Sequence, residues 1–218
     1  MDSGRVTVVL PCMNEAESLP GVLASMPAGY TALVVDNNST DGTAEVAREH
    51  GAQVVVESRP GYGAAVHAGI AAAATPIVAV LDGDGSMDPG ELPKLVDELD
   101  RGVDMAVGRR RPRPGVTWPW HARMGNAAVC WRLRRRHGVH VHDIAPMRVA
   151  RRDAFVALGV EDRRSGYPLE LLVRAGAAGW VVAEQDIAYG PRTGGKSKVS
   201  GSIRGSLLAM FDFWRVIS

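Results

Sequence analysis

The chain has 218 residues, and 46% of them are hydrophobic, which is enough for one domain with a sizeable core. It contains no apolar run of 18 residues, so no transmembrane helix is expected, and its two cysteines, Cys12 and Cys130, are too few for a disulfide framework. Its start lacks the basic and long apolar regions of a signal peptide, so we expect a cytoplasmic protein with free thiols.

The formal net charge is only +1, but the charges are segregated along the chain. Residues 82–104 carry eight acidic side chains against two basic ones, whereas residues 105–142 carry nine arginines and no acidic residue. Such an arginine run is often simply a solvated face. The alternative is a binding surface for an anionic partner such as phosphate, nucleic acid or lipid headgroups.

Apolar, β-branched runs alternate with helical patterns in the first half of the chain. We predict strands at residues 6–10, 32–36, 52–57, 77–82 and 104–109, and helices at 16–26, 43–51, 61–74 and 89–102. The strands are continuous apolar runs, which indicates burial on both faces of a sheet. Repeated strand–helix–strand units predict right-handed crossovers and a parallel sheet.

The alternation weakens after residue 110. Residues 109–120 are rich in Pro and Arg, which predicts a loop or a boundary. The remaining predicted elements are a helix at 124–138, a strand, a turn and a helix start within 139–155, a helix at 167–179, a strand at 180–189, a basic glycine-containing loop at 190–201 and a helix at 202–217.

Polar, acidic and glycine residues follow the carboxyl ends of the first four predicted strands. These stretches are PCMNE (11–15), DNNSTDGT (36–43), SRPGYG (58–63) and DGDGS (82–86). Ligands of parallel sheets bind beyond these strand ends, so the convergence predicts a site near Asp82. Asp88, directly before Pro89, is instead typical of a helix N-cap.

The carboxylates of Asp82 and Asp84 are close enough in sequence to repel each other, and a divalent cation would relieve that repulsion. Hard oxygen ligands suit Mg²⁺ or Mn²⁺, which then bridge to substrate phosphates. We therefore interpret DGDGS as a clamp for a metal ion and a diphosphate.

Other interpretations of the motifs stay open at this point. DGDGS also fits the haloacid-dehalogenase phosphatase signature, in which Asp82 is phosphorylated, although that family usually carries it on the first strand. Residues 190–197, GPRTGGKS, match the P-loop pattern, yet only 21 residues follow. The same loop fits a basic lid over phosphates, with Arg192, Lys196 and Lys198 as its cations. His140 and His142 would share one strand face, as in a zinc site.

Seven stretches then occur in a characteristic order. They are VVLPCMNEAESL, LVVDNNSTDGT, RPGYGAAVHAG, VAVLDGDGSMDP, HDIAPMRVARRDAF, GYPLELLVRAGAAG and RTGGKSKVSG. Together they resemble the family 2 glycosyltransferases of GT-A fold, in particular the dolichyl-phosphate mannose synthase type and the related bacterial polyprenyl-phosphate sugar transferases. The resemblance covers nearly the whole chain.

The resemblance implies an α/β protein with a GT-A, Rossmann-like fold, in which a mostly parallel sheet is flanked by helices in a single domain with two subregions. It implies a nucleotide-sugar-binding half at residues 1–110, an acceptor-binding half at 111–198 and a C-terminal amphipathic helix at 199–218.

It also implies roles for single residues. The positions that would border the nucleotide sugar are Pro11, Asn14, Glu15, Asp36, Asn38, Arg59, Gly63, Asp82 and Lys196. Asp82 and Asp84 would form the D-x-D pair that holds ribose and metal, with Mg²⁺ or Mn²⁺ as the cofactor. The family often has Gln-His at residues 86 and 87, so here Ser86 or water would complete the metal shell.

The implied activity is an inverting sugar transfer from a GDP- or UDP-linked donor, with Arg192 stabilising the departing diphosphate. A polyprenyl (dolichyl-type) phosphate acceptor arrives already anionic and needs no strong base. A hydroxyl acceptor would need one, and Asp143 is then the candidate general base. A non-catalytic sugar-nucleotide sensor is a further alternative, which the intact Asp82–Asp84 pair argues against.

The expected membrane contact involves residues 199–218. Apolar side chains recur there at helical spacing, namely Ile203, Leu207, Met210, Phe211 and Trp214. This pattern is typical of a helix that docks on its own domain or lies in a lipid interface. We expect no nucleic-acid partner, and peripheral contact with the cytoplasmic membrane face is the alternative to a purely cytoplasmic location.

Overall fold

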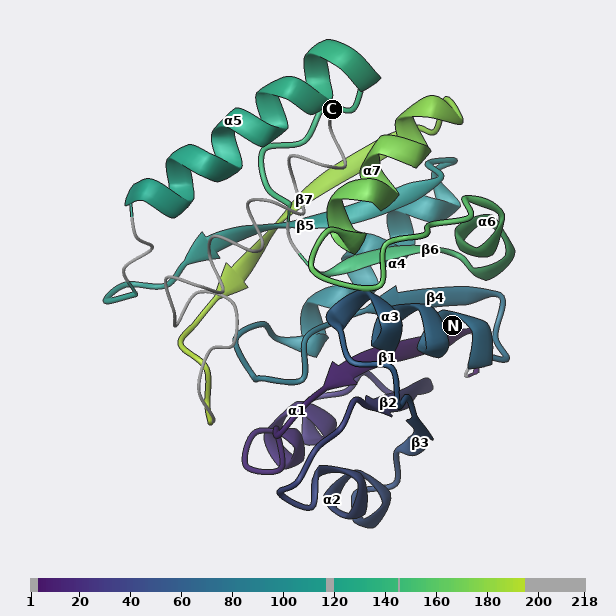
Figure 1. Cartoon of the computed structure of the whole chain (residues 1–218), viewed down its shortest axis with the longest axis vertical. Coiled ribbons are helices and arrows are strands. Elements are labelled where there is room, and N and C mark those ends of the chain that lie inside the picture. The colour runs from purple at the N-terminus through teal and green to yellow at the C-terminus, as the bar shows by residue number, and fades with distance from the viewer. Residues whose placement is uncertain (1–3, 117–119, 145, 195–218) are drawn as a thin grey trace.

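The computed structural model describes residues 4–116, 120–144 and 146–194 (Figure 1). Its strands are β1 (Val6–Cys12), β2 (Tyr30–Asp36), β3 (Gln53–Val56), β4 (Ile77–Val80), β5 (Met105–Pro112), β6 (Arg148–Arg151) and β7 (Val182–Tyr189). Its helices are α1 (Leu19–Ala24), α2 (Thr43–Glu49), α3 (Tyr62–Ala72), α4 (Leu92–Asp100), α5 (Trp120–His137), α6 (Arg152–Ala157) and α7 (Tyr167–Ala177), with a 3-10 turn at Pro89–Glu91 before α4.

The strands form one sheet in the order β3-β2-β1-β4-β6-β5-β7. β1 pairs in parallel with β2 and β4, β2 pairs in parallel with β3, and β5 pairs in parallel with β7. β6 lies between β4 and β5 and is antiparallel to both. The sheet is therefore mostly parallel, and the predicted α/β class with helices flanking a single sheet is confirmed (Figure 1).

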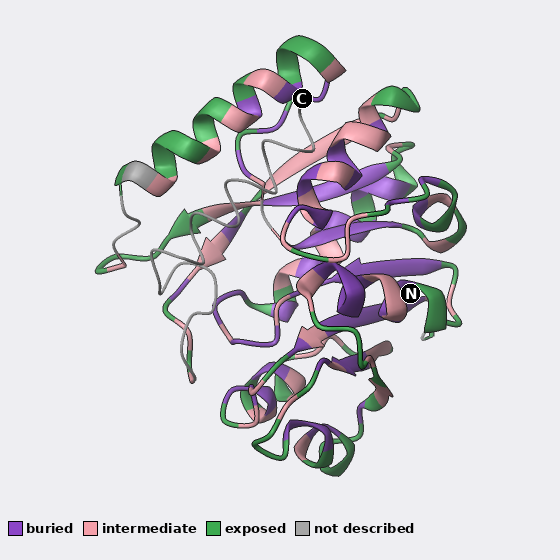
Figure 2. Ribbon diagram, viewed as in Figure 1, coloured by how far each residue is buried: buried purple, intermediate pink, exposed green. Residues whose placement is uncertain are grey.

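Alternate residues of the central strands face two separate layers of helices. On β1, Val9 packs in the core that α3, α5, α6 and α7 cover, whereas Val8 and Leu10 pack in the core beneath α1, α2 and α4. Figure 2 shows the central strands as buried. Burial of each such side chain contributes roughly 1.5–3 kcal/mol, so packing from both sides explains the continuous apolar strands.

The second half departs from the predicted elements at β5 and α5. β5 continues to Pro112 because its whole length pairs with β7, and α5 already begins at Trp120. The loop predicted at 109–120 is therefore shorter than expected.

The strand expected at the start of residues 139–155 does not form there. Val139, Val141 and Asp143 are buried and the histidines between them are exposed, which is the alternation of a strand. However, the N–H groups of His142 and Asp143 donate to the Glu184 carboxylate instead of to a neighbouring strand. The strand forms later, as β6.

The basic loop predicted at 190–201 is described only as far as residue 194. Lys196, Lys198 and the helix predicted at 202–217 lie outside the described residues. Within the part of the chain that the structure describes, no helix combines the length and the apolar character needed to cross a bilayer.

Candidate active site

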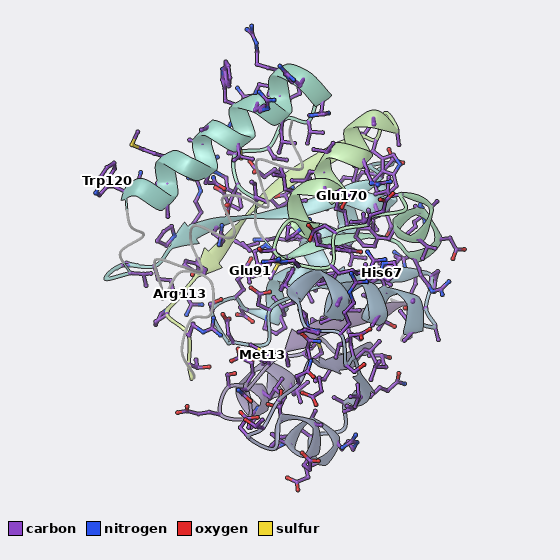
Figure 3. The ribbon with its side chains drawn as sticks, viewed as in Figure 1. Met13, His67, Glu91, Arg113, Trp120 and Glu170 are labelled. Atoms are coloured by element: carbon purple, nitrogen blue, oxygen red, sulfur yellow. The ribbon has the colours of Figure 1, made fainter. Side chains whose placement is uncertain are left out.

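Loops that follow β1, β2 and β4 meet at the carboxyl edge of the sheet. Met13 and Arg113, the residues directly after β1 and β5, mark this edge in Figure 3. Pro11 lies within β1, where it pairs with Val35 of β2. The parallel arrangement therefore brings the predicted motifs to one side of the molecule.

The loop after β1 is tied to the loop after β2. Asn14 adopts a left-handed conformation with a φ of 58°, which Asn tolerates better than most residues. Its Oδ1 accepts the N–H of Thr40 at 2.8 Å, and the N–H of Glu15 donates to Thr43 Oγ1 at 3.0 Å. Asn14 and Glu15 are thereby held beside the end of β2.

The end of β2 in turn holds the loop before α3. Asn37 Nδ2 donates to the carbonyl oxygen of Arg59 at 2.8 Å, and its Oδ1 accepts the N–H of Gly61 at 2.9 Å. Asn38, with a φ of 65°, donates from Nδ2 to the same loop at 3.2 Å. The structure therefore brings Asp36, Asn38 and Arg59 together through Asn37, a buried residue that the sequence analysis did not single out.

The contacts of Gly63 are packing contacts. Its N–H donates to the carbonyl oxygen of Arg164 at 3.0 Å, and a Cβ atom at this position would lie 2.8 Å from the carbonyl oxygen of Asp162. A side chain would push α3 away from the loop that precedes α7. Because Gly63 has no side chain, α3 can start close to that loop. Tyr62, in the first turn of α3, is directed toward Asp82.

Asp82 stands just beyond β4 in surroundings that disfavour its charge. Burial and the neighbouring Asp84 carboxylate raise the pKa of Asp82 to about 7. The hydroxyl of Tyr62 donates a hydrogen bond to Asp82, but Asp82 Oδ1 is buried and has no hydrogen-bond partner among the described residues. A buried carboxylate oxygen without a donor is costly unless a ligand supplies one.

Asp84 and Glu15 share one cation. Arg192 Nη1 is 3.0 Å from Asp84 Oδ2, and Arg192 Nη2 is 2.6 Å from Glu15 Oε1. Both carboxylates are buried, so these ion pairs are worth more than exposed ones. Arg192 therefore links the loop after β1 to the loop after β4 from a position 177 residues away from Glu15 in the chain.

Residues 190–194 lie directly on the Asp82–Ser86 loop. The N–H of Gly190 donates to the carbonyl oxygen of Ser86 at 2.8 Å, and the N–H of Thr193 donates to the carbonyl oxygen of Asp84 at 3.0 Å. The N–H of Ser86 donates to Asp84 Oδ1 at 2.9 Å. The predicted lid thus contacts the acidic loop through Arg192, whereas its residues Lys196 and Lys198 lie outside the described residues.

Asp143, the candidate general base, is fully engaged by Arg110. Arg110 Nε donates to Asp143 Oδ2 and Arg110 Nη2 donates to Asp143 Oδ1, both at 2.8 Å. The Asp143 side chain is 2% exposed. Both oxygens of Asp143 are occupied by Arg110, so these contacts suit a residue that orients Arg110. The Arg110 guanidinium also lies 5.5 Å over the ring of Tyr189.

Arg148 places a second buried cation behind Asp82. It lies on β6 opposite Val80, the last residue of β4, and its Nη1 donates to the carbonyl oxygen of Pro168 at 3.0 Å. Burial lowers the pKa of Arg148, while Tyr62 and Asp82 act in the opposite direction. The Asp82 carboxylate is therefore surrounded by Tyr62, Arg148 and Arg110 on the protein side.

At this edge, Asp82 and Asp84 are the two acids that fit a divalent cation. Among the described residues, no three His, Cys, Asp or Glu side chains are grouped for a metal, and His142 instead pairs with Glu184 at 2.7 Å. Asp82 and Asp84 offer carboxylate oxygens, one of them unpaired and buried. This set fits Mg²⁺ or Mn²⁺, which use few protein oxygens and complete their shell with substrate phosphates and water.

Comparison with known proteins identifies the family of the chain. The profile of "Glycosyl transferase family 2" matches residues 7–159. The chain belongs to glycosyl transferase family 2. An uncharacterised glycosyltransferase of Mycobacterium tuberculosis is 72% identical over 218 residues, which cover 100% of both chains. The polyprenol monophosphomannose synthase of Mycolicibacterium smegmatis is 33% identical over 218 residues, which cover 91% of this chain and 82% of that protein.

A solved structure extends the likeness to the fold. Glucosyl-3-phosphoglycerate synthase from Mycobacterium tuberculosis, in complex with Mn²⁺, UDP-glucose and phosphoglyceric acid, has a TM-score of 0.74 at 24% identity. The match covers 97% of this chain and 79% of that chain. The GT-A prediction is confirmed, and membership of the glycosyltransferase family removes the phosphatase interpretation of DGDGS.

Sequence reasoning missed three charged or aromatic residues of this edge. Tyr62 lies between Gly61 and Gly63, and the sequence analysis interpreted this turn through its glycines alone. Arg110 is one of nine arginines between residues 105 and 142, and only the fold shows which of them faces inward. Arg148 carries no local signal at all, because its burial depends on β6 inserting next to β4.

Proposed function

We propose that this family 2 glycosyltransferase moves a sugar, with inversion, from a GDP- or UDP-linked donor to a polyprenyl phosphate in a Mg²⁺- or Mn²⁺-dependent reaction. The observation that carries the proposal is the pairing of acids and cations at one sheet edge, where Arg192 reaches across to Glu15 and Asp84 beside the unpaired oxygen of Asp82. The relatives named for polyprenyl-phosphate substrates support the acceptor class.

The donor would lie along the loops after β1, β2 and β4. The residues proposed to border its nucleoside are Pro11, Asn14, Glu15, Asp36, Asn38, Arg59 and Gly63, with Gly63 acting through the packing of α3. Asp82 and Asp84 would hold the ribose and the cation, which supplies charge neutralisation for the diphosphate when bound. Lys196 would add a contact from the lid.

The reaction joins an acceptor phosphate oxygen to the anomeric carbon as the bond from that carbon to the donor diphosphate breaks. The acceptor oxygen is already anionic, so no proton has to be removed. Arg192 would stabilise the negative charge that develops on the leaving diphosphate. Arg110, fixed by Asp143, would offset the repulsion between the two phosphate groups, and this use of Asp143 favours the phosphate acceptor over a hydroxyl acceptor.

A transfer assay with labelled donors tests the proposal. GDP- and UDP-linked sugars, polyprenyl phosphate and Mn²⁺ should give an organic-extractable product whose sugar is released by mild acid. Transfer only to a water-soluble hydroxyl acceptor, abolished in Asp143→Asn, would contradict the proposal and restore Asp143 as a base.

Neutralising Arg192 separates its catalytic role from donor binding. In Arg192→Gln, kcat should fall by roughly 100-fold, because one oriented charge on a leaving group is worth about 3 kcal/mol. The donor Kd should change much less, because the remaining contacts bind the nucleoside. Single-turnover rates and calorimetric donor binding check the two quantities separately. A weaker donor Kd with an unchanged single-turnover rate would show that Arg192 contributes only to ground-state binding.

We further propose that the enzyme works in the cytoplasm as a peripheral protein on the membrane face that displays the lipid acceptor. A polyprenyl chain partitions into the bilayer, so its phosphate is presented at the interface.

A further inference from the structure

Helix α5 is fixed to the rest of the domain along one side. Leu133 is buried in the core, and a Cβ atom on Gly176 of α7 would lie 2.4 Å from the carbonyl oxygen of His137. Asn126 holds the middle of the helix, because its Nδ2 donates to the carbonyl oxygen of His142 at 2.8 Å. These contacts set which side of α5 faces outward.

The outward side of α5 carries an apolar stripe, defined as Trp120, Met124 and Trp131. These side chains are 72%, 63% and 61% exposed. At about 100° per residue, they lie within about 40° of one another around the helix axis. Figure 2 shows the outer side of α5 as exposed, and Figure 3 shows Trp120 at its end, pointing away from the sheet.

The alignment distinguishes the stripe from ordinary surface residues. The other exposed large hydrophobic residues of the described chain stand singly, far apart in the sequence, and they are Met13, Val56, Val156 and Val181. Isolated apolar residues are normal on a protein surface, whereas an aligned set at this exposure marks an interaction site.

Arginines border the stripe on both sides. Helical spacing places Arg123 and Arg134 on one flank and Arg135 on the other. The Arg135 guanidinium lies 5.7 Å over the ring of Trp131. The helix contains five arginines and no acidic residue, and its last turn is basic throughout.

We propose that this face of α5 docks the enzyme on an anionic lipid surface. Tryptophan rings settle at the headgroup level of a bilayer, and flanking arginines meet lipid phosphates. A nucleic acid duplex would contact the arginines through its phosphates and leave the aligned apolar side chains unused. A second copy in a two-fold dimer would bring these arginines against the same arginines. The docking helix is therefore α5, which is independent of the contact expected from residues 199–218.

The inference rests on the proposed function for its purpose, because the polyprenyl phosphate acceptor lies at a bilayer surface. α5 is also linked to the site by its contacts. Asn126 Oδ1 accepts the N–H of Ile144, next to Asp143, and Asp143 holds Arg110. Asn126 and Ile144 thus connect α5 to the Arg110–Asp143 pair on the side of the helix that faces the domain.

Vesicle co-sedimentation of the full chain tests the docking without donor or acceptor. Phosphatidylcholine vesicles that contain phosphatidylglycerol should bind the protein, and pure phosphatidylcholine vesicles should bind it far less.

The stripe variant Trp120→Ser/Met124→Ser/Trp131→Ser should bind the anionic vesicles at least about tenfold more weakly. The charge variant Arg123→Gln/Arg134→Gln/Arg135→Gln should lose the preference for anionic lipid. The controls are Val56→Ser/Val181→Ser and Arg48→Gln/Arg151→Gln, exposed positions outside α5 that should leave binding unchanged.

Unchanged vesicle binding of the stripe variant would overturn the proposal, as would a failure of the wild-type protein to bind anionic vesicles. A drop in molecular mass of the stripe variant in light scattering, without a change in vesicle binding, would instead assign the face to a second copy.

Transfer to a short, water-soluble polyprenyl phosphate analogue separates the docking proposal from the proposed function. The stripe variant should keep that activity, and absence of it in the wild-type protein would refute the proposed function while leaving the docking result intact.

Discussion

At the scale of single residues, Asp82 is a carboxylate placed where its charged form is disfavoured. Burial and Asp84 raise its pKa to about 7, whereas an Asp in the unfolded chain titrates near pH 4. Between these values the folded protein holds a proton that the unfolded chain has released. The free energy of unfolding should therefore fall as the pH rises from about 4 to about 7.

Replacing Asp82 by Asn should remove this loss. Asn resembles the protonated acid, so at about pH 8 and without metal the variant should be more stable by roughly 1 kcal/mol or more, or about 2–4 °C in Tm. At about pH 4 the two proteins should unfold at similar temperatures, because both carry a neutral side chain. Thermal unfolding across this range measures the effect, and an equal gain at both ends would show that charge is not its cause.

The Asp143–Arg110 pair gives a second prediction at this scale. Removing one partner leaves a buried charge, so Asp143→Asn should lower the free energy of unfolding by about 3 kcal/mol. Asp143→Leu combined with Arg110→Met removes both charges and should recover much of the loss. Urea denaturation of the single and double variants measures both values. A single variant as stable as the wild-type protein would contradict the buried ion pair.

Some of these residues could be predicted and others could not. Asp82 and Asp84 follow directly from an apolar strand that ends in acids, a pattern visible in the sequence alone. Arg110 and Arg148 become part of the edge only through the pairing of β5 and β6, so no local pattern indicates them. The nucleotide roles of Asp36 and Arg59 came from family resemblance and stay predictions.

At the scale of elements, the contact between the Asp82–Ser86 loop and residues 190–194 depends on Gly85. Gly85 has a φ of 73°, and a Cβ atom there would lie 2.2 Å from Thr193 Oγ1. Gly102 has a comparable φ of 94°, but a Cβ atom there would meet nothing within 4 Å. Both glycines therefore adopt a positive φ, but only Gly85 lies against another segment of the chain.

Alanine at these two positions should separate strain from contact. Both Gly85→Ala and Gly102→Ala should cost roughly 1–2 kcal/mol of stability from the left-handed backbone. Only Gly85→Ala should also displace residues 190–194 and reduce sugar transfer by at least about tenfold, since Arg192 would lose its position. Similar activities for the two variants, at similar stability, would show that this segment does not need its place on the acidic loop.

The elements of the first half could be predicted because each one carries its own signal. Continuous apolar runs, glycine turns and helical spacing occur in strict alternation up to residue 110. The second half depends on contacts between distant segments. The Glu184 side chain takes the backbone N–H groups of His142 and Asp143, so a stretch with strand-like alternation remains a loop.

At the scale of the whole molecule, the sheet gathers widely separated segments at one edge. Parallel pairing of β1, β2 and β4 aligns their carboxyl ends, and residues 190–194 return to the same place after β7. Acids from the first half thereby meet arginines from the second half. From the arginine-rich stretch at residues 105–142, Arg110 faces this site, whereas Arg123, Arg134 and Arg135 of α5 are exposed.

Calorimetric titration of GDP and UDP, with Mn²⁺ and with EDTA, tests the central claim that this edge is a metal-dependent donor site. One of the two nucleotides should bind the wild-type protein at least about tenfold more tightly with Mn²⁺, a difference of about 1.4 kcal/mol. Asp84→Asn should lose this metal dependence, whereas Asp88→Asn, on the same loop but engaged as a cap for Gly90, should keep it. Equal affinities in Mn²⁺ and EDTA for the wild-type protein would contradict the account.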